Sequence, residues 1–473
     1  MIRRLLLLAV FLPAVALAQP PELVGATEQL RLEFTPNGDL ARARACLPDC
    51  RSDRHVRDFG ESSALLRLNG GDNDIYNVVR GEDGSDVILE FRSGTSPALR
   101  RWRVPVSGYR FRLETLGADG LEFLPGPGLA PQLSAGFGVW LESARYVLIT
   151  EDDVESLAVD EPQPAEAEAL WVGARNRFWT ALVSTGGPVR LSRPARSAHP
   201  GMAVTLDPET ESVLEFYLGP VEPAALKAAA PELPRMMYAG LWFWLRWICS
   251  GLFVLLGWIH AVVPNWALAI VLLSLSVSIL MRPLSRIADR LQDDVHRSEA
   301  LLAPELREIR ANHKGEEQSK RVLELYKKHG VHPLYSLKSL AGVAVVIPVF
   351  IGAFDMLAEN IWLANESALW IEDLARPDAF ATLPFTLPFF GSDLNLLPFI
   401  MTAFSVMASM LHRHEAMDAR LLRRQQLNLL LMALAFLALF YTFPAGMVLY
   451  WTTNNLISVV RYGWRLRGRV EVA

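Results

Sequence analysis

Residues 265–284 read NWALAIVLLSLSVSILMRPL, with a single charged residue, Arg282, near the end. Twenty helical residues reach about 30 Å, the thickness of a bilayer's hydrocarbon core, so this run predicts a membrane-spanning helix. Further apolar runs predict four more core spans. They lie at roughly 340–358, 394–411, 427–443 and 445–462.

The composition limits the class of protein. The chain has 473 residues, of which 51% are hydrophobic and 21% charged, so we expect two or three domains. A net charge of −5 argues against DNA as a partner. Three cysteines are too few for a disulfide scaffold or a four-cysteine zinc site. We predict no metal and no cofactor.

The N-terminus has the pattern of an export signal. Within residues 1–18, Arg3 and Arg4 precede an apolar core, and Ala16-Leu17-Ala18 resembles a cleavage site. The alternative is a retained membrane anchor. Both interpretations place the following residues outside the cytoplasm of a bacterium-like cell. Cys46 and Cys50 then lie in an oxidising compartment, either as a small disulfide loop or as two free thiols.

Residues 19–222 have the pattern of a soluble β domain. Short runs alternate apolar and polar residues, and Gly, Pro and Asn clusters separate them, as in antiparallel strands joined by turns. We predict a periplasmic antiparallel β-sandwich without a catalytic site, because no nucleophile elbow, phosphate loop or metal-ligand spacing occurs in it. The runs are Leu30–Phe34, Val87–Phe91, Tyr109–Leu113, Tyr146–Ile149, Met202–Leu206 and Val213–Tyr217.

Residues 223–264 connect this domain to the apolar runs. Within them, residues 241–259 contain four tryptophans and one charged residue, Arg246. Tryptophan is enriched at membrane–water boundaries, so we predict an amphipathic helix at the membrane surface. The alternative is an ordinary spanning helix.

The basic residues predict the topology. Residues 285–338, 412–426 and the C-terminal end carry nineteen Lys and Arg, whereas residues 359–393 carry only Arg376. By the positive-inside rule the β domain is then periplasmic, and the C-terminus, with a short tail of residues 464–473, is cytoplasmic.

Residues 285–335 predict a cytoplasmic helical hairpin. Leu291, Val295 and Leu302 belong to an apolar stripe on one helix face, and Gly315 allows a turn. Such a hairpin either packs on itself or presents a mobile basic surface to a ribosome or an emerging chain.

Polar residues interrupt two of the predicted spans. Ser274, Ser278 and Arg282 are spaced by four and share one helix face. The last span contains Thr452, Thr453, Asn454, Asn455 and Ser458. These side chains either join helices or line a wet cavity. Arg282 either lies in that cavity or extends to the headgroups.

Several motifs, in order, resemble the YidC/Oxa/Alb3 membrane protein insertases, and in layout their Gram-negative bacterial members. The similarity covers about residues 238–465, with a core of 265–463. The motifs are Trp258-Ile-His260, Asn265-Trp266, Arg282-Pro-Leu-Ser285, Leu302-Ala-Pro-Glu-Leu306, Val331-His-Pro-Leu334, Ile347-Pro-Val-Phe350, Ala368–Leu374, Phe443–Tyr450 and Asn455-Leu456.

The resemblance implies a non-enzymatic insertase and chaperone. Its hydrophilic groove would accept nascent membrane proteins and release them sideways into the inner membrane. The implied partners are the lipid bilayer, the Sec translocon with its accessory subunits, and a ribosome at the hairpin. In the family the groove arginine lies where this chain has Ser278, so we expect Arg282 to replace it one turn away. The expected groove residues are Arg282, Ser274, Ser278, Tyr450, Trp451 and Asn455.

Two other functions are consistent with the composition. A transporter would need intramembrane ion ligands or paired repeats, which the sequence does not display. An extracytoplasmic binding sensor would use the β-sandwich as its ligand domain.

Overall fold

The structure is a computed structural model. The predicted export segment, residues 1–18, lies outside the residues that it describes. The described residues are 23–52, 54–60, 64–70, 76–84, 86–130, 136–159, 169–184, 189–192, 200–332, 337–411 and 419–470.

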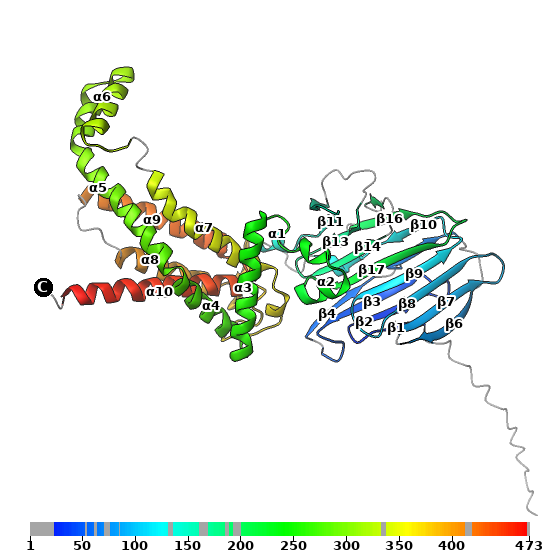
Figure 1. Ribbon diagram of the computed structural model, residues 1–473. Helices are drawn as coiled ribbons and strands as arrows, with labels where there is room; N and C mark the ends of the chain where they lie inside the picture. Colours follow the sequence, from blue (N-terminus) through cyan, green and yellow to red (C-terminus); the bar gives the residue numbers. More distant parts are fainter. Residues whose placement is uncertain are drawn as a thin grey trace, which may run out of the picture.

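Two antiparallel sheets form the first half of the chain (Figure 1). The first has the order β1-β2-β3-β5-β10-β16-β15, with β4 paired to β3, and the second has the order β12-β11-β13-β14-β17-β9-β8-β7-β6. The strands are β1 (Val24–Ala26), β2 (Leu30–Phe34), β3 (Leu40–Leu47), β4 (His55–Phe59), β5 (Leu66–Asn69), β6 (Tyr76–Asp83), β7 (Asp86–Ser93), β8 (Leu99–Val104), β9 (Arg110–Leu116), β10 (Gly120–Phe123), β11 (Arg145–Ile149), β12 (Val154–Ala158), β13 (Trp171–Arg175), β14 (Trp179–Ser184), β15 (Val189–Ser192), β16 (Gly201–Thr205) and β17 (Ser212–Pro220).

The two sheets share one apolar core. Alternate residues of each strand point inward, as in β8, where Arg100, Trp102 and Val104 are buried. The rings of Phe34 on β2 and Trp102 on β8 lie 5.1 Å apart and join the sheets. The Trp102 indole nitrogen donates to Gly38 O at 2.8 Å, so this buried polar group is satisfied.

The described strands include all six runs that alternation predicted, with shifts of up to three residues at their ends. The structure also decides between the two states of the cysteines. Cys46 and Cys50 form a disulfide, with their Cα atoms 5.0 Å apart. The coarse division into a β-rich first half and a helical second half is therefore confirmed.

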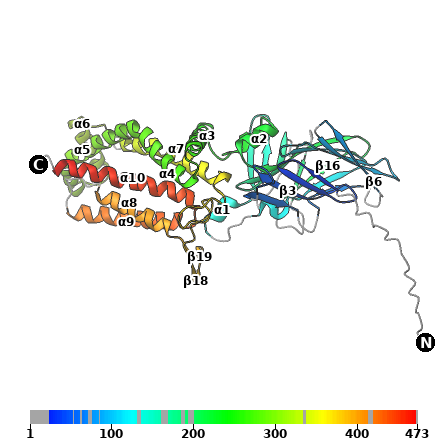
Figure 2. The ribbon, with the colours of Figure 1, turned by 90° about the horizontal axis from the view of Figure 1, so that it is seen from below.

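The second half is helical. The main helices form an elongated bundle, and α3 runs across the direction of α10 (Figures 1 and 2). A two-stranded hairpin, β18 (Ala381–Leu387) and β19 (Gly391–Leu394), interrupts it. The helices are η1 (Gly126–Leu129), α1 (Gly138–Glu142), α2 (Pro223–Ala229), η2 (Leu233–Met236), α3 (Phe243–Val262), α4 (Trp266–Leu280), α5 (Arg282–Asn312), α6 (Gly315–Lys328), α7 (Leu337–Ala358), η3 (Ile361–Leu363), α8 (Leu397–Leu411), α9 (Ala419–Phe440) and α10 (Ala445–Val470).

Within the described chain, α3 is the one helix that is long and apolar enough by itself to cross a membrane. One face of α3, with Leu245, Cys249 and Leu256, is buried, while Trp247 and Trp258 are more than two-thirds exposed. Four shorter apolar segments accompany it. They are Trp266–Leu280, Ile347–Ala358, Leu397–Leu411 and Leu430–Phe440.

Helices α5 and α6 form the predicted helical hairpin, at the end of the bundle farthest from the sheets (Figure 1). It begins at Arg282, three residues earlier than expected, because α5 follows α4 after one residue, Met281. Gly330 has a φ of 64° directly after the C-cap of α6, a left-handed conformation that glycine adopts without a steric penalty.

The turn between β13 and β14 joins the sheets to the bundle. The buried Arg177 guanidinium donates from Nη1 to Ala375 O at 2.7 Å and from Nε to Ala358 O, the last residue of α7. Arg175 Nη2 lies 3.1 Å from Glu359 Oε1. The last carbonyls of a helix have no partner inside the helix, so Arg177 caps α7.

Replacing this capping group should loosen the joint. We expect Arg177→Ala to lower the free energy of unfolding by roughly 3 kcal/mol, because it leaves buried carbonyl and carboxylate groups without their cation. Thermal unfolding of the detergent-solubilised chain and proteolysis around residues 230–243 measure the effect. Arg80→Ala, which removes an exposed arginine of β6, is the control, and equal melting of the two variants would contradict the prediction.

His55 should make the same joint sensitive to acid. It is 3% exposed, its ring lies 5.8 Å from that of Trp362, and burial, with a smaller effect of Arg54, lowers its pKa to about 4. Between pH 6.5 and 4 the unfolded chain therefore binds a proton that the folded chain does not, and stability falls as the pH falls. At about 1.4 kcal/mol for each pH unit of that interval, the loss approaches 3 kcal/mol.

Thermal unfolding across this pH interval, compared between the natural chain and a His55→Gln variant, measures that loss. The variant should show a shallower decrease of the unfolding midpoint on acidification. Parallel curves for the two proteins would show that His55 does not titrate as expected.

Candidate functional site

A groove of about 790 Å³ opens in the helical half, between α4, the start of α5, α7 and α10. Its lining is mixed: one wall is apolar and aromatic, and the other carries hydroxyl, amide and guanidinium groups. The lining residues are Leu275, Val277, Ser278, Ile279, Met281, Arg282, Ser285, Arg286, Val349, Phe350, Tyr450, Trp451, Asn454, Asn455, Ile457, Ser458, Val460, Arg461 and Trp464.

The polar wall is a hydrogen-bonded row along α10. Ser278 Oγ donates to Asn454 Oδ1 at 3.0 Å, and Asn454 Nδ2 donates to Tyr450 O at 3.2 Å. Ser458 Oγ donates to Asn454 O at 3.0 Å. Residues four apart on a helix lie on the same face, so positions 450, 454 and 458 line the groove together. Asn455 Nδ2 reaches Met401 O of α8 at 3.2 Å and joins these two helices.

Ser274 has a different place from the one expected. It is fully buried, and its hydroxyl donates to Tyr450 O at 3.4 Å in the contact between α4 and α10. It does not line the groove, because it lies one turn deeper in this contact than Ser278. The structure thus brings together five of the six expected groove residues and assigns Ser274 to helix packing.

Arg282 lies at the edge of the groove, but not on the helix that carries Ser278. Helix α4 ends at Leu280, and Arg282 is the first residue of α5, followed by Pro283. Proline is favoured in the first turn of a helix because its missing N–H is not needed there. The continuous face expected for Ser274, Ser278 and Arg282 is therefore interrupted at Met281, and Arg282 remains exposed to solvent.

The two aromatic residues of the last helix serve mainly as packing. Tyr450 is 5% exposed. The Trp451 ring lies 4.2 Å from Phe350 of α7 and 5.8 Å from Phe440 of α9, so it connects three helices. Their remaining exposed edges form part of the groove wall.

Two further arginines line this groove that the sequence analysis did not single out. Arg286 follows Arg282 by one helical turn, and Arg461 continues the row of Asn454 and Ser458. Arg461 Nη2 lies 3.3 Å from Tyr462 Oη, and its Nε has no partner within the described part of the chain. The spacing 454, 458 and 461 is the helical signal that could have revealed Arg461.

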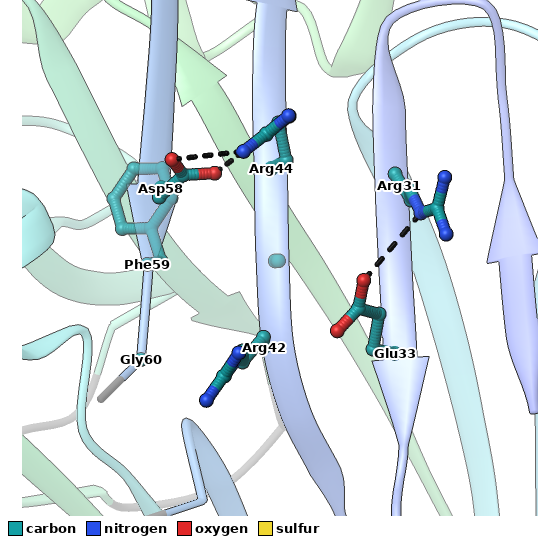
Figure 3. Close-up of a pocket in the computed structure, with 8 residues that line it drawn as sticks. Arg31, Glu33, Arg42, Arg44, Asp58, Phe59 and Gly60 are labelled. Atoms are coloured by element: carbon teal, nitrogen blue, oxygen red, sulfur yellow. Dashed lines mark hydrogen bonds and ion pairs between the residues drawn. The ribbon is translucent and has the colours of Figure 1, made fainter. Parts of the chain in front are cut away.

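The β domain has its own surface depression, over β2, β3 and β4 (Figure 3). Charged residues line it and pair with one another: Arg44 Nε lies 2.7 Å from Asp58 Oδ1, and Arg31 Nε lies 3.5 Å from Glu33 Oε1. Because these pairs are exposed and mutually neutralising, the depression has the character of an ordinary charged sheet surface.

Apolar helices around a polar, positively charged groove are typical of membrane-embedded helical proteins that handle polar cargo. The comparisons with known proteins agree. Residues 258–468 match the sequence model of the 60Kd inner membrane protein family. This part of the chain is therefore similar to that family, and the predicted resemblance to the YidC/Oxa/Alb3 proteins is confirmed.

Individual similar proteins are named as YidC insertases. A membrane protein insertase YidC of Helicobacter pylori is 29% identical over 330 residues, covering 67% of this chain and 54% of the relative. The YidC of Cellvibrio japonicus is 32% identical over 263 residues, covering 54% and 42%. A solved structure of an active YidC insertase, with its first transmembrane domain resolved, has a TM-score of 0.38 at 15% identity and covers 92% of this chain and 91% of its own. The chain spans about half the length of the curated relatives it matches.

The polar wall predicts that water reaches the groove. A Ser278→Cys thiol should react with a membrane-impermeant charged thiol reagent in proteoliposomes, because thiolates form only where water is present. A Leu268→Cys thiol, on an exposed apolar part of the same helix, should react more slowly, by a factor of about ten or more. Both variants carry Cys249→Ala, and equal reaction rates at 268 and 278 would argue against a hydrated groove.

Proposed function

We propose that this protein is a membrane protein insertase and chaperone of the bacterial inner membrane. The observation that carries the proposal is the groove, whose lining combines a hydrogen-bonded polar wall and three arginines with apolar side chains of α4, α7 and α10. The names of the curated relatives support this function over a transporter or a binding sensor.

The proposed orientation has α4, α7, α8, α9 and α10 as five core spans. It places the β domain in the periplasm and the α5–α6 hairpin and the C-terminus in the cytoplasm. The charge asymmetry of the loops supports it, because Arg376 is the one basic residue between 359 and 393. Helix α3 runs across the bundle and exposes its tryptophans. It would then lie along the periplasmic surface of the inner membrane.

The groove would act on a client in two steps. Arg282, Arg286 and Arg461 would attract the acidic or polar leader of a nascent chain, and the Ser and Asn groups would replace part of its hydration. The apolar segment that follows would then move sideways into lipid, driven by the hydrophobic effect. Helix α4 has 15 residues, about 22 Å, which is shorter than a typical hydrocarbon core and favours local thinning of the bilayer.

Partners follow from this proposal. Nascent membrane proteins are the substrates, and the hairpin is a candidate surface for the ribosome. The hairpin has paired charges on its surface, such as Lys328 Nζ and Glu305 Oε2 at 2.9 Å, and exposed apolar residues such as Leu301 and Leu323. The Sec translocon is an expected partner on the basis of the family resemblance alone.

Insertion by the purified protein tests the function. Protein reconstituted in liposomes should increase the protease protection of a small single-span client above that of empty liposomes. Because the structure places three arginines at one groove, Arg282→Ala alone should cause a partial loss. The triple change of Arg282, Arg286 and Arg461 to Ala should slow insertion roughly a hundredfold, at about 1 kcal/mol for each charge.

Two matched variants complete this experiment. The triple change to Lys keeps the charges and should retain most of the activity, whereas Arg321→Ala removes an exposed charge from the hairpin and should have no effect. No insertion by the natural protein with several clients would refute the proposal. Insertion that is indifferent to the triple Ala change would keep the function but exclude the electrostatic step.

A further inference from the structure

The hairpin of β18 and β19 stands apart from both sheets and carries exposed aromatic residues. Its two strands pair only with each other among the described strands. Phe380, Phe385 and Phe389 are each more than half exposed, and residues 379–394 contain one charged residue, Asp393. An isolated two-stranded hairpin is marginally stable in water, and clustered exposed aromatics mark interaction surfaces.

The base of this hairpin is held rigidly. Asp378 Oδ2 accepts hydrogen bonds from Leu396 N at 2.8 Å and Leu397 N at 2.9 Å, so it joins the two ends of the hairpin. At the end of α9, Tyr441 Oη donates to Asp393 O at 2.9 Å. Asp378 is 3% exposed. A buried polar base under an apolar tip indicates a projecting element with a fixed direction rather than a loose loop.

The position of the hairpin indicates what covers the tip. In Figure 2 it projects from one side of the bundle, while α3 lies on the other side, at the same level along the bundle and near the end that faces the sheets. The base of the hairpin adjoins α9, where Leu431 and Leu434 are about half exposed. Exposed apolar side chains therefore occur both on the proposed lipid-facing side of α9 and on the hairpin beside its end.

We propose that the β18–β19 hairpin is a second interfacial anchor, with its phenylalanines in the headgroup region of the outer leaflet. This proposal rests on the proposed placement of the bundle in the membrane. Interfacial segments bury apolar side chains such as phenylalanine at the boundary between headgroups and acyl chains, and the tip lacks the charges that would oppose entry. Anchors on opposite sides of the bundle would resist tilting, so the groove would keep its depth while a client passes.

A partner protein is the other occupant that such a surface could have. The bilayer is favoured because the hairpin lies level with α3, a helix with exposed tryptophans. In vesicles made of lipid alone no partner is present, so burial of the tip there reports on the lipid.

Spin labels measure this burial directly. The full chain, in a Cys249→Ala background with the disulfide intact, is reconstituted in vesicles of phosphatidylethanolamine and phosphatidylglycerol. Single labels are placed by Phe385→Cys on the hairpin, Leu431→Cys on α9 and Val79→Cys on β6. Positions 385, 431 and 79 are similarly exposed in the protein, at 58%, 56% and 61%, so the bilayer alone should distinguish them. Accessibility to oxygen, compared with that to a water-soluble nickel chelate, reports the depth of each label.

We expect the label at 431 to be deep in lipid, that at 385 to be intermediate, and that at 79 to be in water. A label at 385 as accessible to the nickel chelate as that at 79, with 431 in lipid, would overturn the anchor while the membrane placement stands. Water-like behaviour at 431 as well would overturn the membrane placement and the anchor with it.

Discussion

The arrangement of the two halves depends on one buried guanidinium. Arg177 projects from the β13–β14 turn onto the last carbonyl of α7 and onto Ala375 O. Burial lowers its pKa to about 10, and the carboxylates of Glu142, Asp373 and Glu359 oppose this effect, so the group stays charged at neutral pH. Because separation of the two halves would leave the buried carbonyls of Ala358 and Ala375 without their donor, the sheets keep a fixed position at the end of the bundle.

The same requirement, that buried polar groups find partners, shapes the groove. Two serines of α4 donate hydrogen bonds to α10: Ser274 to Tyr450 O and Ser278 to Asn454 Oδ1. These bonds keep the two helices in contact. Asn455 extends this network to α8. Other polar groups, including the three arginines, line the groove beside this network. These groups could bind a polar chain. Packing and the proposed function therefore use neighbouring positions on the same helix faces.

Much of the fold was predictable because the periodicity of apolar residues along the chain indicates strands and helices locally. Alternation identified six strands, and helical spacing together with Gly315 at the turn identified the α5–α6 hairpin. The groove was predictable in part, since Ser278 and Asn455 are polar residues in apolar runs. Arg177 and Asp378 escaped prediction because a single charged residue in a turn has no local pattern that reveals its distant carbonyl or amide partners. The interruption at Met281 escaped for a related reason: Pro283 permits both a continuing and a restarting helix.

By itself the sequence determined the division into a β-rich half and a helical half, the order of the apolar runs, the polar residues within them and the family. The first three follow from composition and spacing along the chain, and the family follows from the resemblance of its ordered motifs. Only the tertiary structure decided that Cys46 and Cys50 are bonded, that Ser274 belongs to a helix contact, and that Arg461 joins Arg282 at one groove. It also decided that the β18–β19 hairpin and α3 lie at one level. Such contacts depend on which distant segments pack together, and local sequence patterns do not predict that packing.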